Sequence, residues 1–220
     1  MKAQSLLSLL HLSSPSLPIG AFAYSQGLEA AVDLGWVHDE TSLQAWLTPI
    51  LTNAQVSLEI PILIRCYQAW QAEDMAALNH WQAVLLANRD TAELVTEEQL
   101  LGQTFHRLLL SLGLELPSEA KSNTYLPLFA KACCHYGVKT EHMILGWLWS
   151  WLENQITVAC KTIPLGQTAA QRVLIALMPC IEDALQKGVL VQDDNIGLTL
   201  PNYSMASAWH ETQYSRLFRS

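Results

Sequence analysis

The chain is poor in charged residues and has no excess of basic ones. Only 15% of its 220 residues are charged, and the formal net charge is −8. Proteins that bind nucleic acids usually present a basic face, so the composition argues against that class. Half of the residues are hydrophobic, which argues against a disordered chain. We therefore expect one domain with a substantial core over residues 1–220.

Long hydrophobic runs and a secretory leader are also missing. The apolar patch at residues 6–10 is interrupted by polar residues, and no small-residue cleavage site follows it. The most apolar stretch, Met143–Leu152, is shorter than the roughly 20 residues that a membrane-spanning helix needs. The five cysteines are odd in number and widely spaced, which is typical of free thiols in a reducing compartment. These features predict a cytoplasmic protein that does not bind a membrane.

Common catalytic motifs are absent. The sequence contains no G-x-S-x-G, no P-loop and no H-E-x-x-H. Glu97 and Glu98 are adjacent on a predicted helix, and we interpret them as charges that face solvent. Nothing in the sequence pairs a nucleophile with a base. The prediction is a protein that is not an enzyme, with an unassigned helical enzyme as an alternative.

Helical periodicity is the main positive signal. Apolar residues recur at helical spacing in several segments, and no stretch of useful length alternates apolar and polar residues. Asp74 is a predicted N-cap, and Gly113 is placed to end a long helix. We predict an all-α, single-domain bundle of roughly ten helices joined by short connections. The last ten residues, 211–220, are predicted to be a flexible tail.

Prolines mark expected interruptions in these helices. Pro49 and Pro61 predict kinks or restarts, and Pro179 predicts a break in the last long helix. A further helix is predicted to begin at Phe22 and to end at Gly35.

Residues 14–29, SPSLPIGAFAYSQGLE, are predicted to form a rigid loop that leads into this helix. Two prolines fix the backbone there, and Gly20 permits positive φ. Tyr24, Gln26 and Glu29 lie at the start of the helix. They are interpreted either as a partner surface presented by a rigid loop, or as a packed Tyr24 beside a solvent-facing Glu29. The residues alone favour the second interpretation.

A second loop, KTIPLGQTAAQ at residues 161–171, precedes the last long helix. Gly166 and Gln167 begin that helix, where free amides and the positive end of the helix dipole lie. Lys161 is either a surface charge or a group that reaches an acidic or phosphate group of another protein. Gly166 would let a partner backbone come close, and Gln167 could form a hydrogen bond across an interface.

The C-terminal segment has an unusual centre. Arg216 and Arg219 flank the apolar pair Leu217-Phe218 in an otherwise acidic protein. An apolar pair beside guanidinium groups is suited to a segment that becomes ordered when it binds a partner.

The candidate metal ligands are Cys133, Cys134, His135 and His142. Their spacing does not match the paired short spacings of structural zinc sites. Neighbouring residues on a helix point about 100° apart, so adjacent cysteines seldom chelate together. Buried structural cysteines are the favoured interpretation, and a transient nickel contact or a nickel-carrier function is the alternative.

Three stretches resemble the UreF family of urease accessory proteins: SPSLPIGAFAYSQGLE, KTIPLGQTAAQ and the C-terminal YSRLFRS. They occur in the family's order and span nearly the whole chain. The resemblance implies an all-α protein that joins UreD (UreH in some organisms) and the GTPase UreG on apo-urease. It implies that the protein couples the GTP cycle of UreG to nickel insertion, forms a homodimer and needs no cofactor, because the complex handles nickel.

The resemblance also assigns residues. Tyr24 and Glu29 belong to the first stretch, Arg219 belongs to the tail that docks partners, and Lys161, Gly166 and Gln167 belong to the second, whose lysine is implicated in the relationship with UreG. The chain departs from the family between residues 88 and 102, where Arg89 is the only basic residue of a segment that is often rich in arginine.

Overall fold

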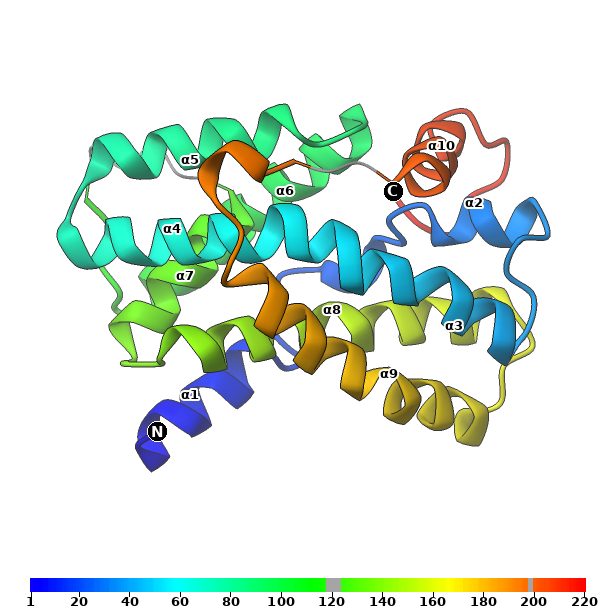
Figure 1. Ribbon diagram of the computed structural model, residues 1–220, viewed down its shortest axis with the longest axis horizontal. Helices are drawn as coiled ribbons and strands as arrows, with labels where there is room; N and C mark the ends of the chain where they lie inside the picture. Colours follow the sequence, from blue (N-terminus) through cyan, green and yellow to red (C-terminus); the bar gives the residue numbers. More distant parts are fainter. Residues whose placement is uncertain (118–123, 198–199) are drawn as a thin grey trace.

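The computed structural model describes residues 1–117, 124–197 and 200–220, and these form an all-α fold without a strand (Figure 1). This confirms the predicted fold class. The helices are α1 (Ala3–Leu12), α2 (Leu28–Asp33), α3 (Glu40–Pro49), α4 (Ile60–Ala72), α5 (Met75–Ala87), α6 (Ala92–Ser111), α7 (Tyr125–His135), α8 (Thr140–Thr162), α9 (Gln167–Gly188) and α10 (Pro201–His210), with short 3₁₀ turns at Ala21–Ala23 and Asp193–Asn195.

One long helix crosses the middle of the molecule. Helix α3, a π-helical segment at Ile50–Glu59 and α4 are continuous, and together they form the helix Glu40–Ala72 (Figure 1). Helix α4 packs against α5 and α7, while the π-helical segment packs against α9, which in turn packs against α8. Helix α6 packs against α7. The buried side chains at these contacts, such as Leu63, Phe105 and Phe129, form one hydrophobic core.

The prolines do not interrupt the helices as expected. Of the predicted kinks or restarts at Pro49 and Pro61, the restarts are wrong, because the backbone between the two prolines continues in the wider π-helical winding. A kink at either proline stays a prediction. The predicted break near Pro179 is also wrong, because α9 continues through it. Pro179 lies on the exposed side of α9, where water can solvate the carbonyl that loses its amide partner.

The central helix also corrects the expectation about long apolar segments. By length and composition, Glu40–Ala72 could cross a membrane, and 61% of its most apolar window is buried inside the fold. A helix that is apolar on most sides is commonly found in the core of a large domain. The sequence-based search missed it because scattered polar residues divide its apolar runs.

Helix ends follow local signals in some places and not in others. The Asp74 side chain accepts a hydrogen bond from the amide of Ala77, and Gly113 has a φ of +81° after α6, so both predicted caps are confirmed. The α-helix predicted from Phe22 is wrong over residues 22–27, where only the short 3₁₀ turn at Ala21–Ala23 forms. Gln26 and Gly27 have φ values of +52° and +80°, so α2 begins only at Leu28.

Candidate functional site

The C-terminal segment folds back onto α2 and the loop before it (Figure 1). Glu29 is only 6% exposed, and its carboxylate accepts hydrogen bonds from the amides of Leu217 at 2.7 Å and Phe218 at 3.0 Å. The solvent-facing position expected for Glu29 is therefore wrong. The amide of Arg219 donates to the carbonyl of Ala23 at 2.8 Å. The tail has a docked conformation here, and its predicted flexibility stays a prediction about motion.

The last residue, Ser220, is fully buried against the same loop. Its main-chain oxygen accepts hydrogen bonds from the amides of Ser25 at 2.7 Å and Gln26 at 3.0 Å, and from the Ser25 hydroxyl. The left-handed backbone at Gln26 and Gly27 shapes this loop where it meets the tail. Successive amides that point at one oxygen form a small concave site for a carbonyl or an anion.

A buried histidine joins α10 to this cluster. The Nε2 atom of His210 lies 3.0 Å from Glu29 Oε2, and its Nδ1 atom lies 2.7 Å from Glu93 Oε2. The Arg216 guanidinium pairs with the other oxygen of Glu93. When its ring carries two protons, His210 donates to both carboxylates. Two cations then face two carboxylates at the junction of α2, α6, α10 and the tail.

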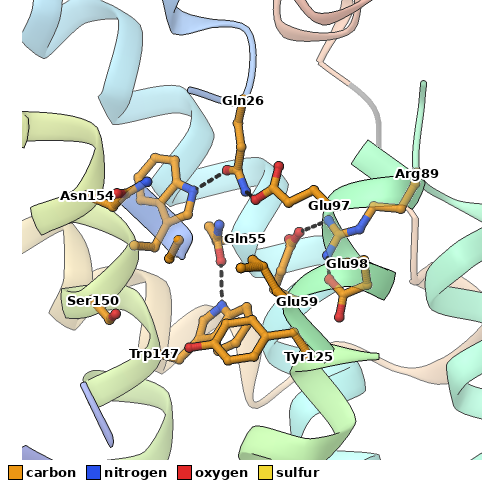
Figure 2. A pocket seen from close by; sticks show the side chains of 13 residues that line it. Gln26, Gln55, Glu59, Arg89, Glu97, Glu98, Tyr125, Trp147, Ser150 and Asn154 are labelled. Atoms are coloured by element: carbon orange, nitrogen blue, oxygen red, sulfur yellow. Dashed lines mark hydrogen bonds and ion pairs between the residues drawn. The ribbon is translucent and has the colours of Figure 1, made fainter. Parts of the chain in front are cut away.

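A polar pocket lies directly beneath the loop (Figure 2). Gln26 and Glu97 point toward one another there, with Gln26 Nε2 2.7 Å from Glu97 Oε1. The Trp151 indole, which can only donate, lies 2.7 Å from Gln26 Oε1 and so fixes the orientation of the amide. The other Glu97 oxygen accepts a hydrogen bond from the Ser220 hydroxyl at 2.7 Å.

Deeper in the pocket, Arg89 lies between two buried carboxylates. Its guanidinium is 2.5 Å from Glu59 and 2.8 Å from Glu98 (Figure 2). The second oxygen of Glu98 accepts a hydrogen bond from the amide of Leu126, in the first turn of α7. The interpretation of Glu97 and Glu98 as solvent-facing charges is wrong, since they are only 6% and 4% exposed. Gln26, Ser220 and Leu126 come from other segments, which helical periodicity cannot reveal, while Arg89 is nine residues from Glu98.

Burial controls the acid–base properties of the pocket. It raises the pKa of Glu97 to about 7, because the hydrogen bonds from Ser220 and Gln26 offset only part of the cost of desolvating a charge. Burial also raises the pKa of Glu59 despite the neighbouring Arg89. The pocket therefore holds more acidic groups than one guanidinium can neutralise.

Lys161, at the end of α8, lies beside the tail and the first loop. Its Nζ atom is 5.6 Å from the centre of the Phe218 ring and 6.0 Å from that of Phe22, distances typical of cation–π contacts. Phe22 is 61% exposed and Leu217 is 72% exposed. We call Phe22, Lys161, Leu217, Phe218 and Arg219 the tail patch. It combines residues of all three sequence motifs.

The corner between α8 and α9 is exposed to solvent, unlike the part of the loop before α2 that contacts the tail. Gly166 and Gln167 are exposed. Gly166 has a φ of −69°, and no atom lies within 4 Å of where its Cβ would be, so the fold itself does not require glycine there. Pro164 and Leu165 line a cleft of about 420 Å³ that faces the start of α3. Exposed Arg172 pairs with Glu40 nearby.

The eight predicted partner-binding residues thus divide into two groups. Tyr24, Gln26 and Glu29 are engaged inside the molecule, and exposed Arg216 is engaged by its ion pair with Glu93. Tyr24 is 4% exposed and its carbonyl accepts a hydrogen bond from Asn154, which confirms that it packs. Lys161, Gly166, Gln167 and Arg219 are exposed. Sequence reasoning missed His210 and Glu93, and no local pattern could have found them because their partners lie more than a hundred residues away.

The candidate metal ligands do not form a site in the part of the chain that the structure describes. No group of three or more His, Cys, Asp or Glu residues there is arranged to hold a metal ion. Cys133 is fully buried, and burial raises the pKa of its thiol and that of Cys134. Metal binding requires the thiolate, which these environments disfavour.

Comparison with known proteins identifies the family. The UreF family profile matches residues 37–178. A urease accessory protein UreF from Chromohalobacter salexigens is 50% identical, over 98% of this chain and 95% of the relative. One from Hahella chejuensis is 44% identical over the full length of both chains, and one from Marinobacter nauticus is 46% identical over 98% of this chain and 94% of the relative. The chain belongs to the UreF family of urease accessory proteins.

Proposed function

We propose that this chain is a non-catalytic, cytoplasmic accessory protein that works through its surfaces. It joins UreD (or UreH) and the GTPase UreG on apo-urease, and it couples the GTP cycle of UreG to nickel insertion. Nickel is the cargo of the whole complex, so the chain needs no cofactor of its own, and it works as a homodimer. Membership of the UreF family supports this proposal.

The observation that carries the proposal is the tail patch. Three segments that are far apart in the sequence meet there, and each contributes an exposed or partly exposed side chain. Exposed Phe22 and Leu217 offer apolar area, while Lys161 and Arg219 add positive charge to an acidic protein. Aromatic and arginine side chains are enriched at the centres of protein interfaces. The patch therefore suits a partner surface that is apolar with an acidic rim, and we assign it to UreG.

The α8–α9 corner extends this surface. Gly166 presents main chain that a partner can approach closely, and the exposed Gln167 side chain can form a hydrogen bond across an interface. Because Lys161 is only a few residues away, one partner could contact the corner and the tail patch together.

The proposal is tested by co-expression and pull-down with UreD and UreG of the same organism. The intact chain is expected to bring down both. Lys161→Ala, and separately the triple variant Leu217→Ala/Phe218→Ala/Arg219→Ala, should lose UreG and keep UreD. Lys139→Ala is the matched control, because Lys139 is an exposed lysine beside the opposite end of the same helix.

An intact chain that binds neither partner would contradict the proposal. Retention of UreG by both variants would contradict the assignment of the tail patch. Equilibrium dialysis of the isolated chain against nickel then addresses the alternative, since a nickel carrier binds the ion tightly and loses it on substitution of Cys133 and Cys134.

A further inference from the structure

We propose that Glu29 is a positioning residue that holds the tail patch together, rather than a residue that touches the partner. This inference rests on the proposed function of the patch as the UreG surface. The added point is that the tail must be docked for that surface to form. The patch depends on a segment of the tail that belongs to no helix and is fixed only by its contacts with the rest of the chain.

The geometry of Glu29 supports this role. Both of its carboxylate oxygens are occupied, one by the amide of Leu217 and the other by the amide of Phe218 and by His210. Its side chain is only 8% exposed, so little of it is accessible to a partner. A carboxylate that accepts several main-chain hydrogen bonds in a buried site fixes the donors in one arrangement. The donors here are the two residues at the centre of the patch.

The groups around Glu29 reinforce the same conformation. His210 on α10 connects Glu29 to Glu93 on α6, and Arg216 of the tail pairs with that same Glu93. On the other side of the patch, the buried Ser220 is held by Ser25, Gln26 and Glu97. The tail is thus attached before and after the patch. Leu217 and Arg219 point outward, while Phe218 and Ser220 are buried.

Limited proteolysis tests the positioning directly. Trypsin cuts after arginine, so the bonds after Arg216 and Arg219 report whether the tail is docked. Glu29→Gln cannot accept from both amides and His210 at once, and we expect at least about ten-fold faster cleavage at these two bonds, measured by mass spectrometry. Glu182→Gln, an exposed glutamate on α9, is the matched control and should cleave like the wild type.

Two precautions keep the result interpretable. Circular dichroism establishes that each variant is folded before cleavage is compared. If Glu29→Gln does not fold, Glu29→Asp replaces it, since aspartate keeps the charge beside His210 and is too short to reach both tail amides. Unchanged cleavage in a folded variant would overturn the inference.

A double-variant cycle separates positioning from direct contact. In the wild-type background we expect Glu29→Gln to weaken UreG binding about ten-fold. In the triple variant Leu217→Ala/Phe218→Ala/Arg219→Ala, whose residual UreG affinity is measured by titration at high UreG concentration, the same change should have no further effect, because the side chains that Glu29 positions are already gone. A further loss there would show that Glu29 contacts the partner, which would overturn the inference. If the triple variant binds UreG normally, the function assigned to the patch fails, and the proteolysis result still decides the role of Glu29.

Discussion

Two of the motif segments, the loop before α2 and the corner between α8 and α9, have opposite structural characters. The loop is closed: Tyr24 and Glu29 are buried, and Gln26 is hydrogen-bonded on both sides of its amide. The corner is open, with Gly166 and Gln167 exposed. Functional motifs can therefore reflect two different physical requirements. Apart from the exposed Phe22, the loop supports the tail patch from inside the fold. The corner presents its main chain and side chains to solvent.

Loss of the buried Arg89 is expected to lower the free energy of unfolding more than any other change proposed here. It tests whether the closed loop region depends on charge pairing inside the fold. Arg89→Ala leaves Glu59 and Glu98 buried without a cation, so we expect the free energy of unfolding to fall by about 3–5 kcal/mol in urea titrations. The control is Arg172→Ala, which removes the exposed pair with Glu40 at the open corner and should leave the urea midpoint unchanged. Similar losses in both variants would remove the contrast between the regions.

The next largest change in the free energy of unfolding is expected from the titration of Glu97. The pKa of this carboxyl is about 7 in the folded chain and 4.5 in its ordinary state. A raised pKa means that the folded chain holds the proton more tightly. The stabilising contribution is therefore complete below about pH 4.5 and is lost as the pH rises through about 7. Glutamine does not ionise, so Glu97→Gln avoids the loss of stability that the wild type undergoes as this carboxyl ionises. The variant should be more stable than the wild type by about 3 kcal/mol at pH 8.

The measurement is the free energy of unfolding at several pH values. The advantage of Glu97→Gln should disappear below about pH 4.5. Glu40 at the open corner provides the opposite case. Its pKa is lowered by the Arg172 hydrogen bond, so its small contribution is present at neutral pH and is lost on acidification. A pH-independent difference between Glu97→Gln and the wild type would contradict the buried titration.

Two glycines allow a smaller and closely matched comparison. Gly27 has a φ of +80°, and an added Cβ would lie 3.0 Å from the backbone nitrogen of Ser207 in α10. We expect Gly27→Ala to destabilise the protein by about 1–3 kcal/mol, measured by thermal or urea unfolding. Gly166→Ala should be close to neutral because its backbone is unstrained and nothing is near its Cβ. If both variants lost the same amount of stability, the contact between α2 and α10 would have to shift enough to accept the added Cβ at residue 27.

The smallest effect on stability is expected at the open corner itself. Gln167→Ala removes an exposed side chain, so the melting temperature should not change. If the corner contacts UreG, the same variant should bind UreG more weakly in a titration. Gln171→Ala, an exposed glutamine one turn further along α9, is the control. Unchanged binding by Gln167→Ala would limit the partner surface to the tail patch.

The fold class could be predicted because its signals are local. The periodicity of apolar residues, the Asp74 cap and the turn at Gly113 each depend on residues within a few positions of one another. Proline effects were predicted less well. Pro179 is tolerated because it faces water, and that depends on how α9 packs rather than on its sequence alone.

The site could be predicted only in part. The motifs marked three segments that meet in the fold, but they did not indicate which side chains are buried. Glu29, Glu93, Glu97 and Glu98 resemble surface charges in the sequence, yet Glu93 is partly buried and the other three are buried. The partners of Glu29, Glu93 and Glu97 lie more than a hundred residues away, and Glu98 pairs with Arg89 and with the amide of Leu126. Nothing near Glu29 in the sequence indicates His210 or Leu217, which lie 181 and 188 residues away.

The same separation has a consequence for when the surface can form. The contacts between Ser25 and Ser220 close a loop of 195 residues, so they cannot form until nearly all of this sequence has been synthesised and the helices between them have assembled. An emerging or partly folded chain has Lys161 and Phe22 but lacks the tail patch. A partner that recognises the patch would therefore bind only chains in which the tail has docked, and its binding would report that this part of the fold has formed.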